Sequence, residues 1–234
     1  MFDETTAQKF IEYALHTRAR ELIPEGRKLK NGRMSPYFFN SGSFHSGRTM
    51  WELSHAYAKL INMRVMRECN FNLLYGPPYK GTILAPTVAM MLDIMGYCPD
   101  IRFCTSRKEP KKHGERGSLI GAPITDSSRV LIIDDVITDG GTKREAVEFI
   151  RQQGGEPVGL VIAFDRQECG TGEFSAVREF KRDYKIPVYA VATLTDLIVV
   201  IQSRLGDGKN DCFGDRVILE KILAYKKEYG DGVA

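Results

Sequence analysis

The sequence predicts an α/β protein in which helices flank a central parallel sheet. Short runs of branched apolar residues alternate with longer segments whose apolar residues recur at helical spacing. The short runs are apolar throughout, as in parallel strands buried on both faces. Of the 234 residues, 43% are hydrophobic and 27% are charged, which suits one domain with a sizeable core.

The N-terminal segment predicts a helix followed by extended chain. Thr5 and Gln8 form a capping-box pair ahead of apolar residues at helical spacing, namely Phe10, Ile11, Ala14 and Leu15. Residues 22–44 then contain glycines, Pro36 and an aromatic cluster, which favour extended segments and turns. We expect residues 1–45 to form an N-terminal hood subdomain ahead of a core that spans residues 46–234.

The core segment contains the strand and helix alternation. Its periodicity predicts helices over 49–66, 82–95 and 142–153, and strands over 72–75, 101–105, 130–133, 158–164 and 188–193. From Leu194 onward, the apolar stretch LIVVI gives way to charged sequence, which predicts helices packed on the outside of the domain.

Composition excludes several function classes. The net charge is only +3, from 33 basic and 30 acidic residues, so no general field favours nucleic acid. The five cysteines contain no C-x-x-C pair and suggest neither a disulfide framework nor a thiolate zinc site, which fits a reducing cytoplasm. The acidic start is unlike a signal peptide, and no apolar run approaches the ~18 residues of a membrane span. We expect no membrane partner and no nucleic-acid partner.

The run RKEPKKHGERG, residues 107–117, concentrates basic residues between two predicted strands. Taken alone, it is most simply a solvated loop, because blocks of charge usually stay in water. A nucleic-acid patch and a mobile loop that closes on an anionic substrate are the alternatives.

The stretch VLIIDDVITDGGTKREAVEFI, residues 130–150, is the most specific in the chain. Two carboxylates, Asp134 and Asp135, follow an apolar strand at the edge where open α/β sheets bind ligands. The turn over residues 138–142 then opens a helix, so its backbone N–H groups could hold a phosphate. A helix cap, a Walker-B acid or a receiver-domain pocket could also explain an acid pair. However, no Walker-A motif is present, and the pair lies too late in the chain for a receiver domain.

These residues resemble the PRPP (5-phosphoribosyl 1-diphosphate) signature of type I phosphoribosyltransferases. Three further segments, KLKNGRMSPYFFNSG, YGPPYKG and FDRQECGTGE, together with the basic run, are similar to orotate phosphoribosyltransferases over nearly the whole chain. The resemblance implies the type I phosphoribosyltransferase fold. It also implies Mg²⁺-dependent transfer of the phosphoribosyl group from PRPP to N1 of orotate, giving orotidine 5′-phosphate and diphosphate.

The resemblance also implies roles for individual residues. Lys111, with His113 second to it, would serve the leaving diphosphate, and Asp134 and Asp135 would hold the ribose hydroxyls. Orotate would contact Phe38, Phe39, Thr138 and Arg166; a guanidinium suits the orotate carboxylate. The implied PRPP contacts are Lys30, Tyr79, Lys80, Arg107, Lys108, Lys111, His113, Asp134, Asp135, Val136, Ile137, Thr138, Asp139, Gly140, Gly141 and Thr142.

The resemblance further implies a homodimer in which the flexible catalytic loop, residues 106–118, reaches the neighbouring subunit's site. Mg²⁺ would bind mainly through PRPP and water, with no site made by protein ligands alone. The chain departs from the common pattern at Asp139, at Pro78 and Pro110, where alanine is common, and at Lys112, where aspartate is common.

Two other functions remain open at this stage. A transferase for a purine base would keep the segment 134–142 without needing Phe38, Phe39, Arg166 or the basic run. A regulatory protein that binds nucleic acid would need a basic face or an added domain, and neither is evident in the sequence.

Overall fold

The computed structural model describes residues 4–17, 19–29, 31–107, 119–137, 141–170, 172, 174–207 and 215–231. Its main sheet has six strands in the order β5-β4-β3-β6-β7-β8. These strands are β3 (Leu73–Gly76), β4 (Arg102–Ser106), β5 (Leu119–Gly121), β6 (Arg129–Val136), β7 (Glu156–Asp165) and β8 (Val188–Thr193). All neighbouring pairs are parallel except β4 and β5. The predicted α/β class is confirmed.

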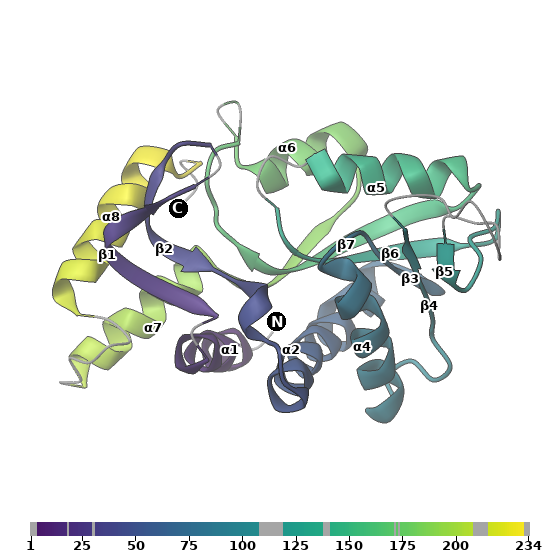
Figure 1. Ribbon diagram of the computed structural model, residues 1–234, viewed down its shortest axis with the longest axis horizontal. Helices are drawn as coiled ribbons and strands as arrows, with labels where there is room; N and C mark the ends of the chain where they lie inside the picture. The colour runs from purple at the N-terminus through teal and green to yellow at the C-terminus, as the bar shows by residue number, and fades with distance from the viewer. Residues whose placement is uncertain are drawn as a thin grey trace.

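Helices cover both faces of this sheet (Figure 1). One face carries α5 (Gly141–Gln152) and α6 (Ala176–Tyr184). The other carries α1 (Glu4–His16), α2 (Gly47–Leu60) and α4 (Gly81–Ile94). α2 continues through a π-type stretch, Ile61–Val65, into the short α3 (Met66–Glu68). None of the helices in the described segments is long and apolar enough to cross a membrane.

Alternation along β6 explains why the sheet needs cover on both sides. Leu131 and Ile133 belong to the hydrophobic cluster under α1, α2 and α4, whereas Val130 and Ile132 belong to the cluster under α5 and α6. All four side chains are fully buried. Successive side chains of a strand point to opposite faces, so an unbroken apolar run requires two covering layers.

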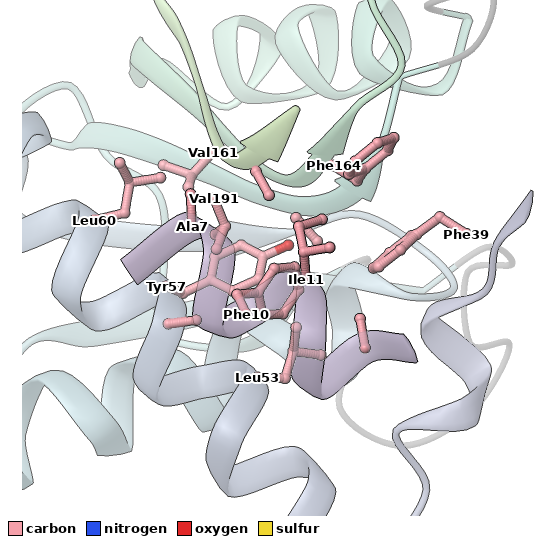
Figure 2. Packing of buried hydrophobic residues seen from close by; sticks show 14 of the residues in the cluster. Ala7, Phe10, Ile11, Phe39, Leu53, Tyr57, Leu60, Val161, Phe164 and Val191 are labelled. Atoms are coloured by element: carbon pink, nitrogen blue, oxygen red, sulfur yellow. The ribbon is translucent and has the colours of Figure 1, made fainter. Parts of the chain in front are cut away.

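Residues 1–45 comprise two parts that pack in different places. Strands β1 (Arg20–Lys28) and β2 (Met34–Phe39) form a separate antiparallel pair that packs against α8 (Arg216–Tyr229). Helix α1 instead packs against β8 and α7 (Leu194–Gly206). Figure 2 shows Phe10 and Ile11 of α1 among the buried side chains of the main sheet. The hairpin and the turn that follows it, residues 20–43, are therefore the part of residues 1–45 that stands apart from the main sheet, and we call this part the hood.

Two elements differ from the sequence expectations. The strand β5 and the helix α6 were not predicted, and β5 makes the sheet mixed rather than wholly parallel. β5 is only three residues long and mostly exposed, so it carries little hydrophobic signal. β6 extends to Val136, which places both acids inside the strand rather than after it, because their backbone groups still pair with β7.

The turn after β3 depends on two glycines. A Cβ atom on Gly76 would overlap the carbonyl oxygen of Gly81, and one on Gly81 would lie 2.8 Å from the carbonyl oxygen of Ile133. Backbone therefore packs directly on backbone where β3 leads into α4. This close approach holds Tyr79 and Lys80 at the sheet edge.

We expect Gly76→Ala to lower the free energy of unfolding by about 1–3 kcal/mol, because the backbone must shift to admit the methyl group. Gly47→Ala, at the start of α2, is the matched control, since a Cβ there meets no atom within 4 Å. Urea unfolding of both variants checks this. Equal stabilities for the two variants would contradict the close-packed turn.

Candidate functional site

The candidate site lies where the parallel strands end. Gly76 of β3, Ser106 of β4, Val136 of β6 and Asp165 of β7 are the last residues of their strands, and parallel pairing brings them to one edge. Arg107 follows at the end of β4, so the basic run begins at this same edge. In open α/β sheets this edge is where ligands bind.

Asp134 is the buried member of the acid pair. Its Oδ2 lies 2.6 Å from Nζ of Lys143, and its Oδ1 accepts the main-chain N–H of Asp135 at 2.9 Å. The main-chain carbonyl of Asp134 accepts the hydroxyl of Tyr57 at 2.6 Å. Burial raises the pKa of the Asp134 carboxyl, and Lys143 opposes that rise. The ion pair therefore favours an ionised Asp134 in a setting that disfavours charge.

Asp135 is half-buried and joins the hood to the sheet edge. Its Oδ2 accepts the hydroxyl of Ser41 at 2.6 Å. Ser41 lies in a single helical turn after β2, next to Gly42. A Cβ on Gly42 would lie 2.9 Å from Nζ of Lys80, so the lysine head lies against that turn. The structure thus brings Asp135 and Lys80, predicted from distant segments, to the same turn of the hood.

The predicted phosphate turn is described only at its end. Gly141 and Thr142 are the first two residues of α5, and Thr142 is exposed. Before the turn, Val136 is the last residue of β6 and Ile137 follows it. Free N–H groups at the start of a helix favour anions. The remaining predicted residues lie outside the described residues: Lys30, Lys108, Lys111, His113, Thr138, Asp139 and Gly140.

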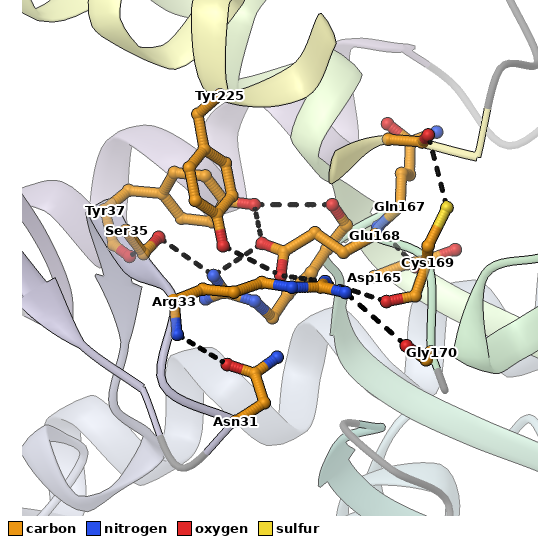
Figure 3. A network of polar contacts seen from close by, with 12 residues as sticks. Asn31, Arg33, Ser35, Tyr37, Asp165, Gln167, Glu168, Cys169, Gly170 and Tyr225 are labelled. Carbon is orange, nitrogen blue, oxygen red and sulfur yellow. Dashed lines mark hydrogen bonds and ion pairs between the residues drawn. The ribbon is translucent and has the colours of Figure 1, made fainter. Parts of the chain in front are cut away.

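A buried polar network surrounds Glu168 (Figure 3), and Arg166 belongs to it. Its Nη2 is 2.5 Å from Oε1 of Glu168 and donates to the hydroxyl of Ser35 at 2.9 Å. Tyr37 and Tyr225 donate their hydroxyls to the two oxygens of Glu168, at 2.6 and 3.1 Å. Burial acts to lower the pKa of Arg166, but the tyrosines and Glu168 outweigh it and the pKa is raised. The guanidinium therefore stays charged.

Two further side chains, Arg33 and Gln167, fix the segment that carries Arg166. Arg33 donates to the carbonyl of Cys169 at 2.8 Å, and its guanidinium lies over the ring of Tyr229 in α8. Gln167 has a positive φ of 52°, and its side-chain oxygen accepts the N–H of Thr195, in the first turn of α7, at 2.9 Å. Residues 165–170 are thus held by the hood, α7 and α8 together.

The rings of Phe38 and Phe39 do not lie on one side of β2. Phe39 is buried and stacks on Phe164 with the ring centroids 5.7 Å apart. Phe38 is half-buried, and the guanidinium of Arg27 lies 3.9 Å from its ring centroid. Successive residues of a strand face opposite ways, so the two rings lie on opposite sides of β2. The two sides share only the backbone of residues 38 and 39.

Sequence reasoning missed three residues that complete the site: Ser41, Lys143 and Glu168. Lys143 resembled any helical lysine, and only the fold brings it to Asp134. Glu168 stands two residues after Arg166, a weak signal for an ion pair. Across the described residues, no three or more His, Cys, Asp and Glu side chains are grouped so that they could hold a metal ion.

Comparisons with known proteins agree with the observed fold. Residues 52–188, more than half of the chain, match the phosphoribosyl transferase domain family. An orotate phosphoribosyltransferase of Neisseria meningitidis serogroup C is 43% identical over 95% of this chain and 97% of that protein. Another, from Marinobacter nauticus, is 41% identical over the same shares. The crystal structure of orotate phosphoribosyltransferase from Francisella tularensis has a TM-score of 0.80 and 30% identity, covering 95% of this chain and 99% of that chain.

We expect Glu168→Gln to lower the free energy of unfolding by about 3–5 kcal/mol, because Arg166 would lose its partner charge while buried. Glu156→Gln is the matched control: its carboxylate lies 2.6 Å from Arg129, but both side chains are exposed. Loss of that pair should cost less than about 1 kcal/mol. Denaturant unfolding of both variants checks this, and similar losses would mean that the Glu168 network is not buried in solution.

Proposed function

The chain belongs to the orotate phosphoribosyltransferase family, and we propose that it binds PRPP at the carboxyl edge of its sheet, beneath the β1–β2 hairpin. The enzyme transfers the 5-phosphoribosyl group of PRPP to N1 of orotate and releases diphosphate. The product is orotidine 5′-phosphate, an intermediate of pyrimidine synthesis.

One observation carries the assignment of the PRPP site. Asp135 at the end of β6, Ser41 of the hood and the head of Lys80 meet at one turn, and the first turn of α5 contacts the neighbouring Asp134 through Lys143. Asp135 would accept hydrogen bonds from the ribose hydroxyls. The 5′-phosphate would lie at the turn 138–142, where N–H groups and the helix dipole stabilise negative charge. Lys80, with Tyr79 beside it and Lys30, would contact the diphosphate.

Orotate would bind between this sugar site and the hood. The charged Arg166 is our candidate for the orotate carboxylate, through the N–H groups that Ser35 and Glu168 do not use. Thr138 and the backbone of Phe38 and Phe39 would meet the polar edge of the ring. A planar guanidinium distinguishes orotate from bases that lack a carboxylate.

Departure of diphosphate is the step that the basic run would assist. Negative charge grows on the leaving group, and Lys111 would place a cation there, with Arg107, Lys108 and His113 around it. One well-placed donor is worth ~3–4 kcal/mol in comparable sites. A unit charge pair at about 4 Å is worth about 4 kcal/mol at an effective dielectric constant near 20, but about 1 kcal/mol in water. Exclusion of water therefore matters as much as the charge itself.

Mg²⁺ fits the donors that the site offers. Asp135 is a half-buried carboxylate at the sheet edge, and Mg²⁺ is commonly held by one or two carboxylates, water and substrate phosphates. Asp135 would meet the water shell of the ion, with most ligands supplied by PRPP. When bound, Mg²⁺ would neutralise part of the diphosphate charge.

A second copy of the chain would cover the outer side of α4. Ile83, Met90 and Ile94 are more than half exposed there. Beside them is a hollow of about 250 Å³, lined by residues that include Met90, Ile101 and Phe103. Exposed apolar surface of this kind marks interfaces between proteins. We propose a homodimer through this face, in which the loop 106–118 of one subunit serves the other subunit's site.

Cysteine usage supports a reducing, cytoplasmic setting. Cys69, Cys98 and Cys104 are free thiols. Cytoplasmic proteins keep their cysteines in this form.

The protein mixed with PRPP and Mg²⁺ should consume orotate and leave hypoxanthine unchanged, because Arg166 has no carboxylate to bind in a purine. Ultraviolet absorbance of each base follows the reaction. Arg166→Met is the matched variant and should raise the KM for orotate far more than the KM for PRPP. Consumption of hypoxanthine in place of orotate would overturn the assignment of the base site.

Mixing two inactive variants tests the shared loop. Lys111→Ala and Asp135→Asn disable the loop and the sugar site respectively. If the loop acts on the partner's site, random pairing of subunits should restore about a quarter of the wild-type activity. Ile94→Glu, introduced into both variants, should prevent this recovery by placing a charge on the apolar face. No recovery in the first mixture, with dimers present, would show that the loop acts within its own chain.

A further inference from the structure

Lys143 is a buried lysine at the candidate PRPP site to which no role has yet been given. It stands in the first turn of α5, next to the turn proposed to hold the 5′-phosphate. Its side chain is 9% exposed, and its Nζ lies 2.6 Å from Oδ2 of Asp134, whose side chain is 4% exposed. Lysine is almost never buried to this extent unless it is paired. The contact is therefore a buried ion pair within the site rather than a surface ion pair.

Asp134 uses its polar groups within the protein. Its two carboxylate oxygens meet Lys143 and the N–H of Asp135, and its main-chain carbonyl meets Tyr57. Asp135, the next residue along β6, is half-buried and meets the hood through Ser41. Neighbouring residues of a strand face opposite sides. The two acids thus point to different surroundings, and only Asp135 has the exposure needed to meet a sugar.

We propose that Lys143 is a positioning residue of the PRPP site and acts through Asp134. It holds the Asp134 carboxylate in place, so that Asp135 is presented to the ribose. It also cancels one of the two negative charges that the acid pair would otherwise set against the phosphates of PRPP. The inference rests on the proposed location of the PRPP site.

The position of Lys143 in α5 gives this contact a second consequence. The helix that supplies Lys143 also begins with Gly141 and Thr142, the end of the proposed phosphate turn. The Lys143–Asp134 ion pair ties that helix start to β6, which carries the acids. The sugar contact and the phosphate contact of one substrate are therefore held at a set spacing. Contacts of this kind, behind the groups that touch a ligand, orient those groups.

Lys143→Met tests the proposal, because methionine keeps much of the side-chain volume and removes the charge. Calorimetric titration with PRPP, with and without Mg²⁺, should show binding weakened roughly ten- to hundredfold. The KM for PRPP should rise while the KM for orotate stays unchanged. Lys143→Arg should restore part of the affinity. Lys227→Met, at an exposed position of α8, is the matched control and should bind PRPP as the wild type does.

Two further variants test whether Lys143 acts through Asp134: the single variant Asp134→Asn and the double variant Asp134→Asn/Lys143→Met. The double variant removes both buried charges, so it should fold even if Lys143→Met alone does not. If Lys143 acts through Asp134, its removal from the Asp134→Asn protein should change PRPP affinity little. If Lys143→Met weakens PRPP binding as much in the Asp134→Asn protein as in the wild type, Lys143 contacts the substrate directly and the proposal is wrong. A folded Lys143→Met protein with wild-type PRPP affinity would overturn it too. Failure of the wild type to bind PRPP would instead contradict the proposed function.

Discussion

The buried charge of Asp134 is the constraint on which the site depends. β6 is apolar and covered on both faces, and it carries a carboxylate into a setting that raises its pKa. A charge in such a place is stable only when it is paired and hydrogen-bonded. Lys143 from α5 and the main chain of Asp135 supply the partners for the carboxylate, while Tyr57 from α2 takes the main-chain carbonyl. Elements from both faces of the sheet are thereby tied to the strand that ends at the site.

Glu168 imposes the same constraint on the other side of the site. Its carboxylate is buried and meets Arg166 and the hydroxyls of two tyrosines, one from the hood and one from α8. Within the described residues the hood has two strands, which do not pair with the main sheet. This network, together with stacking of Phe39 on Phe164, attaches the hood to the end of β7 and to the segment that carries Arg166. The proposed specificity for orotate and the attachment of the hood therefore share one set of contacts.

Sequence patterns were most informative where the chain is buried. The run from Val130 to Ile133 predicted a central strand because an unbroken apolar run has few other stable settings. The strand β5 was not predicted because it is short and exposed, and the amphipathic helix α6 was not recognised. The sequence also did not decide where the rings of Phe38 and Phe39 lie. An aromatic cluster has the same composition whether its rings share one side of a strand or face opposite sides.

By itself, the sequence determined the fold class, the sheet edge that carries the site and the family resemblance, because hydrophobic periodicity and the acid–glycine segment are local properties of the chain. Only the tertiary structure decided which charges meet. Lys143 is nine residues after Asp134 but contacts it because α5 packs back over β6. Ser41 of the hood contacts Asp135, which is far from it in the sequence. Such pairings depend on how helices and strands pack, and no spacing in the sequence encodes the distance between them.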